Sequence, residues 1–301
     1  MLRGDYLEAW RINALVMAAR DPASRDDPRL PYHLRWVWDG RPFQGRRILV
    51  RCYHGLGDTL QFARYLPVLR SFAVSLTVEA QPELLPILSS VAGIDRLIPF
   101  VHDAPAPHSE CDMEIMELPF ALKLTPDAIP PLRLSIRSTP AFEGAIGLCW
   151  EAGNWDPGRS IPSNFLEPFT TWPCITLQTC PTELNVLNRQ GCPRDMVATA
   201  SLVAGLDLVI TVDTMIAHLA GAQNRLTWLL LKHQPDWRWM AGRSDSPWYP
   251  SLRIYRQPAP GDWPAVITQI TEEFAAARSR SFEGGQPARA SAAACGQITR
   301  R

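Results

Sequence analysis

The sequence predicts an α/β fold built from two successive domains, each with a parallel sheet covered by helices on both faces. The first observation behind this is length, because 301 residues exceed the usual size of one domain. The second is a repeated alternation of short β-branched runs with helical periodicity, which is typical of parallel sheets. The third is a strand-to-helix turn with small polar residues in each half, at residues 55–61 and 207–222.

Composition indicates a globular protein and names no polyanionic partner. Hydrophobic residues make up 46% of the chain, and 30 Lys and Arg balance 30 Asp and Glu, so we expect no nucleic-acid partner. No apolar run approaches the ~20 residues of a membrane span, and the charged N-terminus cannot act as a signal peptide. The seven cysteines show no metal-ligand spacing. These features predict a cytoplasmic protein with reduced thiols and no stable membrane insertion.

The N-terminal part, residues 1–40, is predicted to be a helix followed by an extended arm. Apolar residues at helical spacing predict the helix over residues 4–19, and Asp21-Pro22 ends it. Several prolines and the Asp39-Gly40 turn then predict an irregular connection.

The first compact domain is predicted over residues 41–140. Its strands are expected at residues 47–52, 74–79, 96–100 and 111–116, with helices after Gly57 and over residues 82–91. The last strand carries an acidic string that superficially resembles a metal site. Alternation along a strand predicts instead a solvated acidic face; the string is Glu110, Asp112, Glu114 and Glu117. A proline-rich linker is expected to end the domain.

The second domain is predicted over residues 141–277. Strands are expected at residues 145–150, 175–178, 208–212, 227–231 and 252–255. Helices are expected at residues 163–169, 183–187, 196–204, 214–222 and 262–277. Residues 278–301 are rich in Ser, Arg, Ala and Gly, which predicts a disordered tail.

The stretch from residue 207 to residue 222 predicts a buried strand, a tight turn and a helix start. Asp213 and Thr214 end the strand and can cap the helix. The first turn of a helix offers unpaired N–H groups and positive dipole, which suit a phosphate. Two alternatives remain open here: the Asp-Thr pair is only a cap, and His218 is only a core histidine.

The glycines of the first domain fit dinucleotide binding poorly. A strand precedes Gly55 and Gly57, but Leu60 stands where the fingerprint needs a third small residue. Asp58 would also repel a pyrophosphate. The loop therefore presents Asp58 at a helix start, either as a functional carboxylate facing an interdomain cleft or only as an N-terminal cap.

Several motifs together resemble a known family. Residues 55–67, Gly-Leu-Gly-Asp-Thr-Leu-Gln-Phe-Ala-Arg-Tyr-Leu-Pro, look like the N-terminal signature of glycosyltransferases attached to tetratricopeptide repeats, relatives of the bacterial heptosyltransferases. Residues 159–162, 207–222, 236–239 and 245–250 are similar to later motifs of this group in the same order. The likeness spans roughly residues 4 to 270.

The resemblance implies a GT-B fold, in which two Rossmann-like domains with parallel sheets face an interdomain cleft. It implies metal-independent, inverting sugar transfer from a nucleotide diphosphate-sugar to a hydroxyl acceptor, with no cofactor. By this likeness Asp58 is the general base, and the first domain binds the acceptor through a loop that includes Gly55, Gly57, Thr59 and Gln61. The donor side comprises Arg159, Ser160, Asp213, Thr214, Met215 and His218. Neither the nucleotide (ADP, UDP or GDP), nor the sugar, nor the acceptor is decided by any residue.

Three places depart from the family pattern or stay ambiguous. His54 replaces a usual residue, and it is a second base, an orienter of Asp58 or a simple loop histidine. Gln178 ends a strand and either reads the base or ribose or is structural. Residues 151–158 are an altered version of the family's glycine-asparagine loop.

The tryptophan-rich loop at residues 232–250 has two interpretations. Its tryptophans either wall a sugar or nucleotide pocket or form a hydrophobic cluster that pins the loop; they are Trp237, Trp239 and Trp248. Likewise Arg238 and Arg243 either meet phosphate or form salt bridges with nearby aspartates.

Two rival functions accompany the transferase hypothesis. The chain could be a degenerate relative that binds a nucleotide-sugar without turnover and works through protein contacts. It could also be a sugar-nucleotide epimerase of similar architecture. An epimerase would alter the donor sugar with no acceptor present, whereas a binding protein would give no product.

Overall fold

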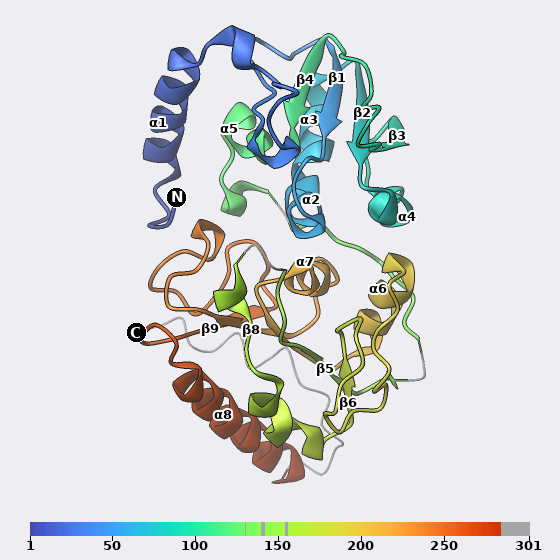
Figure 1. Ribbon diagram of the computed structural model, residues 1–301, viewed down its shortest axis with the longest axis vertical. Helices are drawn as coiled ribbons and strands as arrows, with labels where there is room; N and C mark the ends of the chain where they lie inside the picture. Colours follow the sequence, from blue (N-terminus) through green and yellow to red (C-terminus); the bar gives the residue numbers. More distant parts are fainter. Residues whose placement is uncertain (130, 140–141, 154–155, 284–301) are drawn as a thin grey trace. The chain divides into compact units, whose positions relative to one another are not determined.

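The computed structural model describes residues 1–129, 131–139, 142–153 and 156–283 (Figure 1). The chain divides into two compact units, Met1–Leu134 and Ser135–Arg301. The predicted domain boundary at residues 140–141 and the predicted tail beyond residue 283 lie outside the described residues. No helix among the described residues is both long enough and apolar enough to cross a membrane.

The first unit holds a four-stranded parallel sheet with the strand order β3-β2-β1-β4. Its strands are β1 (Arg47–Arg51), β2 (Ser75–Ala80), β3 (Arg96–Pro99) and β4 (Cys111–Glu114). The central strand β1 is buried on both faces through Ile48, Leu49 and Val50, as its uninterrupted apolar run predicts. The chain runs from β1 outward to β3 and then returns to β4 on the other side of β1.

Short helices connect these strands (Figure 1). The predicted N-terminal helix is α1 (Tyr6–Ala19), which Asp5 caps. The helix predicted after Gly57 forms, but it divides into α2 (Leu56–Phe62), η3 (Ala63–Tyr65) and α3 (Leu66–Phe72). Pro67 has no N–H to donate to Ala63, so the chain tightens there into a 3-10 turn.

The remaining short elements of the first unit follow the same pattern. Proline stands in the first turn of several, where its missing N–H costs no helical hydrogen bond. They are η1 (Pro22–Ser24), η2 (Tyr32–Leu34), η4 (Pro82–Leu84), α4 (Leu85–Leu88), η5 (Ile115–Glu117), α5 (Leu118–Leu122) and η6 (Pro126–Ala128).

The prediction of a solvated acidic face on β4 is wrong. Asp112 and Glu114 are only 2% and 1% exposed, and Cys111 and Met113 on the other face are buried as well. Alternation misled because these carboxylates accept hydrogen bonds from within the protein, from the Arg51 guanidinium and from backbone N–H groups of Ser109 and Met116.

The second unit holds a five-stranded parallel sheet with the strand order β6-β5-β7-β8-β9. Its strands are β5 (Ile146–Cys149), β6 (Cys174–Thr176), β7 (Leu208–Val212), β8 (Thr227–Leu231) and β9 (Leu252–Arg256). Every residue of β7 is buried, which confirms the strand predicted there. Its helices are η8 (Pro157–Arg159), η9 (Ser163–Thr171), α6 (Met196–Gly205), α7 (Met215–Ala222), η10 (Trp237–Trp239) and α8 (Trp263–Glu283).

Three helix predictions in this unit need correction. The helix at residues 163–169 is the 3-10 helix η9, because Pro168 inside it cannot donate to an α-helical ladder. Residues 183–187 form no helix; the segment folds back so that Thr182 N–H donates to the Arg189 carbonyl. The predicted helix end at residue 277 is too early, since α8 continues to Glu283 and no glycine or proline follows Pro264 until Gly284.

Candidate functional site

The turn after β7 lies where an open α/β sheet binds ligands. The chain leaves β5 toward β6 on one side and later returns to β7 on the other, so β5 and β7 flank the topological switch point of the sheet. Thr214 follows β7 and caps α7, because its Oγ1 accepts the N–H of Ile216 at 3.2 Å. Thr214 and Met215 are half-buried, whereas α7 from Ile216 onward is buried. The start of α7 is therefore its most accessible part.

Arg159 is bound to this turn. Its Nη1 donates to the carbonyl oxygen of Asp213 at 2.7 Å, and Nη2 donates to the carbonyl of Gly153 at 3.4 Å. Burial raises the pKa of the Asp213 carboxyl, and the nearby Arg238 and Trp239 side chains only partly offset this effect. The structure thus brings the predicted residues Arg159, Asp213 and Thr214 together at the switch point.

Two further residues that were predicted to bind the nucleotide-sugar donor, Gln178 and Ser160, lie beside the carboxyl ends of these strands. Gln178 accepts the Cys149 thiol at 3.5 Å through Oε1, and Cys149 Sγ lies 3.6 Å from Thr214 Oγ1. Ser160 Oγ accepts the N–H of Ala152 at 3.0 Å, which shapes the loop after β5. Residues 154–155 of the predicted glycine-asparagine loop lie outside the described residues.

His218 is a core residue of the second unit. It is 3% exposed, its Nδ1 lies 3.1 Å from the Tyr249 hydroxyl, and its ring stacks on Trp239 at a centroid distance of 5.3 Å. These contacts fasten α7 to the tryptophan-rich loop, as the core-histidine alternative describes. A donor contact by His218 stays a prediction.

The tryptophan-rich loop is pinned by its own hydrophobic cluster. Trp239 and Trp248 are fully buried, and the Trp248 indole N–H donates to the carbonyl of Arg238 at 2.7 Å. Trp237 is half-buried and packs edge-on against Trp248. The arginines pair with neighbouring aspartates, Arg243 with Asp245 at 2.7 Å and Arg238 with Asp236 at 3.5 Å. These contacts agree with the cluster and salt-bridge alternatives, and a sugar, nucleotide or phosphate contact by Trp237 or Arg238 stays a prediction.

In the first unit, the glycine loop sits at the corresponding switch point, between β1 and β4. Asp58 is half-buried, and its Oδ2 accepts the N–H of Gly55 at 3.0 Å. This bond is the cap that the second alternative for Asp58 describes, and it fixes the carboxylate at the start of α2. Its role as general base stays a prediction.

Two successive hydrogen bonds support the glycine loop. Thr59 Oγ1 donates to Gln81 Oε1 at 3.0 Å, and Gln81 Nε2 donates to the carbonyl of His54 at 2.7 Å. Gln61 is fully buried in the core of the unit. Gln81 is a supporting residue that the motif did not predict.

His54 lies against a buried carboxylate that sequence reasoning also missed. Its Nδ1 is 3.0 Å from Glu114 Oε1, and the His54 side chain is 24% exposed, against 2% for Glu114. The order of strands could have indicated this contact, since β4 pairs with β1 directly and their carboxyl ends therefore meet.

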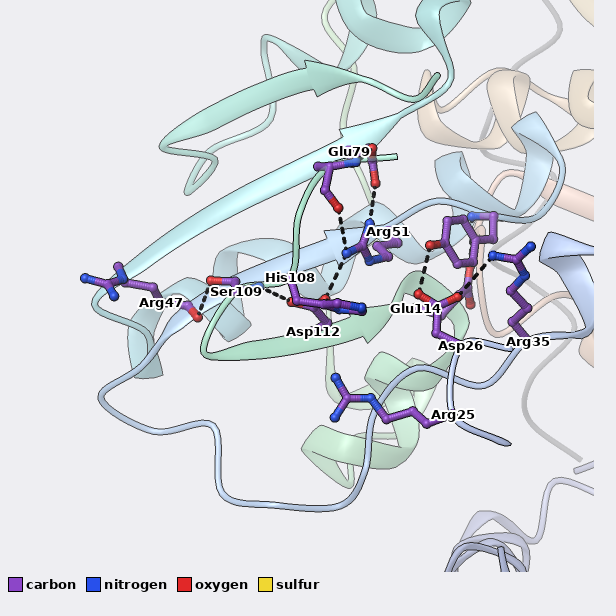
Figure 2. Close-up of polar contacts among 12 residues, drawn as sticks. Arg25, Asp26, Arg35, Arg47, Arg51, Glu79, His108, Ser109, Asp112 and Glu114 are labelled. Carbon is purple, nitrogen blue, oxygen red and sulfur yellow. Dashed lines mark hydrogen bonds and ion pairs between the residues drawn. The ribbon is translucent and has the colours of Figure 1, made fainter. Parts of the chain in front are cut away.

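A buried ion-pair network lies deeper in the same sheet (Figure 2). Arg51 is 1% exposed and bonds Glu79 and Asp112, each at 2.9 Å. The two carboxylates also accept backbone N–H groups of the loop before β4, from Ala106 and Ser109. Burial alone lowers the pKa of the Arg51 guanidinium, but its acidic partners, Asp112 first, raise it above its usual value. This network joins β1 to β2, to β4 and to the loop before β4.

Within the described ranges, no three His, Cys, Asp or Glu side chains cluster as possible metal ligands. Metal-independent chemistry stays a prediction.

Comparisons with known proteins identify the fold. No protein-family model matches the chain, and no curated protein sequence matches it. Among solved structures, Escherichia coli ADP-heptose lipopolysaccharide heptosyltransferase II is similar over 76% of this chain and 98% of its own, at 14% identity and a TM-score of 0.53.

Two further solved structures agree. A family 9 glycosyltransferase of Veillonella parvula matches 72% of this chain and 87% of its own, at 14% identity and a TM-score of 0.52. E. coli heptosyltransferase WaaC with ADP-2-deoxy-2-fluoro heptose matches 76% of this chain and 99% of its own, at 14% identity and a TM-score of 0.50. The predicted fold is confirmed: the chain has two parallel α/β sheets like those of the GT-B heptosyltransferases. How the two domains face each other stays a prediction.

Proposed function

We propose that the protein is a glycosyltransferase that moves a sugar from a nucleoside diphosphate-sugar to a hydroxyl acceptor, without a metal and with inversion at the anomeric carbon. The observation that carries the proposal is the strand-turn-helix at the β5/β7 switch point, with Arg159 bound to the carbonyl of Asp213. The fold shared with heptosyltransferases supports the same class.

The turn after β7 suits the departing diphosphate. The positive end of the α7 dipole and the guanidinium of Arg159 lie together at the turn that follows β7. Donors fixed before the reaction stabilise the charge that develops on a leaving phosphate oxygen. They can do so without a metal ion.

The loop before α2 suits the acceptor. Asp58 is held at the β1/β4 switch point by the Gly55 N–H, so its carboxylate is oriented before an acceptor binds. It takes the proton of the attacking hydroxyl while the hydroxyl oxygen bonds to the anomeric carbon and the diphosphate leaves. A single displacement of this kind inverts the configuration at that carbon.

ADP-heptose is the first donor to test, because one of the similar structures holds an ADP-heptose analogue. UDP- and GDP-sugars are the alternatives. A ligand that binds only the folded protein raises its melting temperature with occupancy. We expect ADP-heptose and ADP to raise it more than UDP-glucose or GDP-mannose.

The matched variant is Thr214→Val, with Thr170→Val as its control. Thr214 caps α7, whereas the hydroxyl of Thr170 donates to the carbonyl of Glu167 within the 3-10 helix η9. We expect Thr214→Val to reduce the nucleotide-induced shift and Thr170→Val to leave it unchanged. A melting temperature that no nucleotide or nucleotide-sugar raises would contradict the donor site.

The same samples separate the rival functions. Release of ADP from ADP-heptose supports a transferase that uses water slowly as an acceptor. A nucleotide-sugar that raises the melting temperature but releases no ADP with any acceptor tested supports a binding protein. A heptose that changes configuration while still attached to ADP supports an epimerase.

A further inference from the structure

Lys232 is one of two lysines in the chain, and it lies beside the turn proposed to bind the donor. It follows β8 directly, and β8 pairs in parallel with β7, whose carboxyl end leads into that turn. The register pairs Val212 with Leu230, so Thr214 and Lys232 are each two residues beyond the same level of the sheet. Ligands of open α/β sheets bind beyond the carboxyl ends of the strands, which is where Lys232 lies.

The Lys232 ammonium is bound to the loop that follows β5. Its Nζ donates to Asp156 Oδ2 at 2.6 Å. Asp156 precedes the short helix η8, and η8 ends at Arg159, whose guanidinium donates to the carbonyl of Asp213. One end of η8 is therefore held at the end of β8 and the other at the end of β7. Two cations consequently lie at neighbouring strand ends, joined by one short helix.

The ammonium is within reach of a ligand from solvent. The Lys232 side chain is 29% exposed, and that of Asp156 is 19% exposed. An ammonium has three N–H donors, and among the described residues one of them is engaged, by Asp156. A phosphate oxygen can therefore accept a hydrogen bond from Nζ without displacing Asp156. Lysine binds phosphate groups in this way, as a point charge at the end of a long side chain.

We infer that Lys232 is a further donor-binding residue, whose ammonium binds a phosphate group of the nucleoside diphosphate beside the start of α7. The inference rests on the proposed function and adds a second cation to its donor site. The ammonium joins the positive end of the α7 dipole and the Arg159 guanidinium. Fixed positive charges of this kind stabilise the negative charge that develops on the departing diphosphate.

A structural role is the alternative for Lys232. In that role it would act only through Asp156, by holding η8 and Arg159 in place. The two roles predict different effects of Asp156→Asn. If Lys232 only holds the loop, loss of the ion pair weakens nucleotide binding. If the ammonium contacts the phosphate, the same substitution removes a competing negative charge, so binding is unchanged or tighter.

Calorimetric titration of ADP and of inorganic pyrophosphate separates these roles. We expect Asp156→Asn to bind both ligands at least as tightly as the wild type. The double variant Lys232→Met/Asp156→Asn should bind them about tenfold more weakly than Asp156→Asn, the usual loss for one hydrogen bond to a charged group. Because the double variant contains neither partner of the ion pair, this loss is due to the ammonium and not to an unpaired carboxylate.

Lys123→Met is the matched control. Lys123 is the other lysine, and it is exposed on the first unit, where its Nζ lies 3.4 Å from the centre of the Phe120 ring. Its substitution should leave the affinity for ADP and for pyrophosphate unchanged.

Carbon-13 NMR of labelled lysine supplies a measurement on the unsubstituted protein. With two lysines the wild type gives two Cε signals, and Lys123→Met assigns them by the loss of one. ADP and pyrophosphate should shift the Lys232 signal with the Kd found by calorimetry and leave the Lys123 signal in place. Adenosine, which has no phosphate group, should leave both signals in place.

The inference is overturned if the double variant binds ADP as tightly as Asp156→Asn, or if Asp156→Asn alone weakens binding as much as the double variant does. Should either variant fail to fold, a wild-type Lys232 signal that saturating ADP leaves unchanged overturns it. A wild type that binds ADP with the expected dependence on Lys232, yet releases no ADP from ADP-heptose, would overturn the proposed function and not the phosphate contact.

Discussion

The two switch points have the same backbone plan and opposite side-chain chemistry. At each, a parallel strand ends, the chain turns and a helix begins, after β1 in the first unit and after β7 in the second. The first is held by carboxylates that accept backbone N–H groups: Asp58, Glu79, Asp112, Glu114 and Glu117. The second is held by a hydroxyl cap from Thr214 and by the guanidinium of Arg159, which donates to a carbonyl.

This difference supports the different tasks proposed for the two switch points. A switch point lined by carboxylates repels an anion and can accept protons. A switch point formed by a helix N-terminus and a guanidinium attracts an anion. Sugar transfer from a nucleoside diphosphate-sugar needs both, a group that accepts the proton of the acceptor hydroxyl and a site that binds the diphosphate. Four substitutions test how the two switch points differ.

The largest effect is expected from Arg51→Met. It would remove the guanidinium that pairs with both Glu79 and Asp112 and leave Asp112 with only the imidazole of His108 beside it, so we expect the free energy of unfolding to fall by about 3–5 kcal/mol. Urea unfolding measures this loss. Arg47→Met is the control, since that arginine is on the same strand but 67% exposed, and it should change stability little. Equal stability of both variants would show that the network is dispensable.

The next effect concerns pH and Glu117. Burial raises the pKa of the Glu117 carboxyl to about 7, even though it accepts N–H groups from Val37, Trp38 and Glu114. The folded state therefore holds this proton more tightly than the unfolded state. The stabilisation it gives is complete below pH ~4.5 and is lost as the pH rises toward 7.

We expect the wild-type protein to lose about 2–3 kcal/mol between pH 5 and pH 8 through this group, and Glu117→Gln to lack that part of the pH dependence. Urea unfolding at several pH values measures the difference. Parallel curves for the wild type and Glu117→Gln would refute the assignment. Glu167→Gln, at an exposed position of the 3-10 helix η9 in the other unit, is the control.

A smaller effect is expected in the second unit, where packing replaces charge. A Cβ at Gly221 would lie 2.4 Å from the Tyr249 ring, which itself contacts His218. Alanine normally stabilises a helix relative to glycine, but here overpacking should make Gly221→Ala about 1–3 kcal/mol less stable. Gly158→Ala has room for its Cβ and should be tolerated. A stabilised Gly221→Ala would mean that the tyrosine moves freely.

The smallest effect on stability is expected from Thr214→Val. It removes the side-chain cap of α7 and should cost about 1 kcal/mol in thermal or urea unfolding. Its effect on ADP affinity should be the more visible one, a several-fold loss by calorimetry. An unchanged affinity for ADP would show that the Thr214 hydroxyl does not contribute to the donor site.

The strands and both strand-to-helix turns could be predicted from sequence. The apolar, β-branched run of β7 predicts a strand that is buried on both faces. Thr214 before a helical pattern predicts the N-cap of a helix. Where prediction failed, long-range contacts decided. Asp112 and Glu114 alternate with apolar residues as a solvated face would, and only the pairing of β4 with β1 brings them to Arg51 and His54.

The same reason explains the tryptophan-rich loop. From the sequence alone, its aromatic residues could either wall a pocket or form a hydrophobic cluster, because both arrangements need the same residue types. The stacking of His218 on Trp239 and the burial of Trp248 are tertiary contacts between α7 and the loop, so no local pattern could choose.

The division of labour between the two switch points is tested most directly by one measurement: calorimetric titration of ADP-heptose into wild type and Asp58→Asn, with ADP release followed in the same samples. We expect Asp58→Asn to bind ADP-heptose within about threefold of wild type and to release ADP at least ~100-fold more slowly. Undiminished release by Asp58→Asn, or loss of ADP-heptose binding by this variant alone, would contradict it.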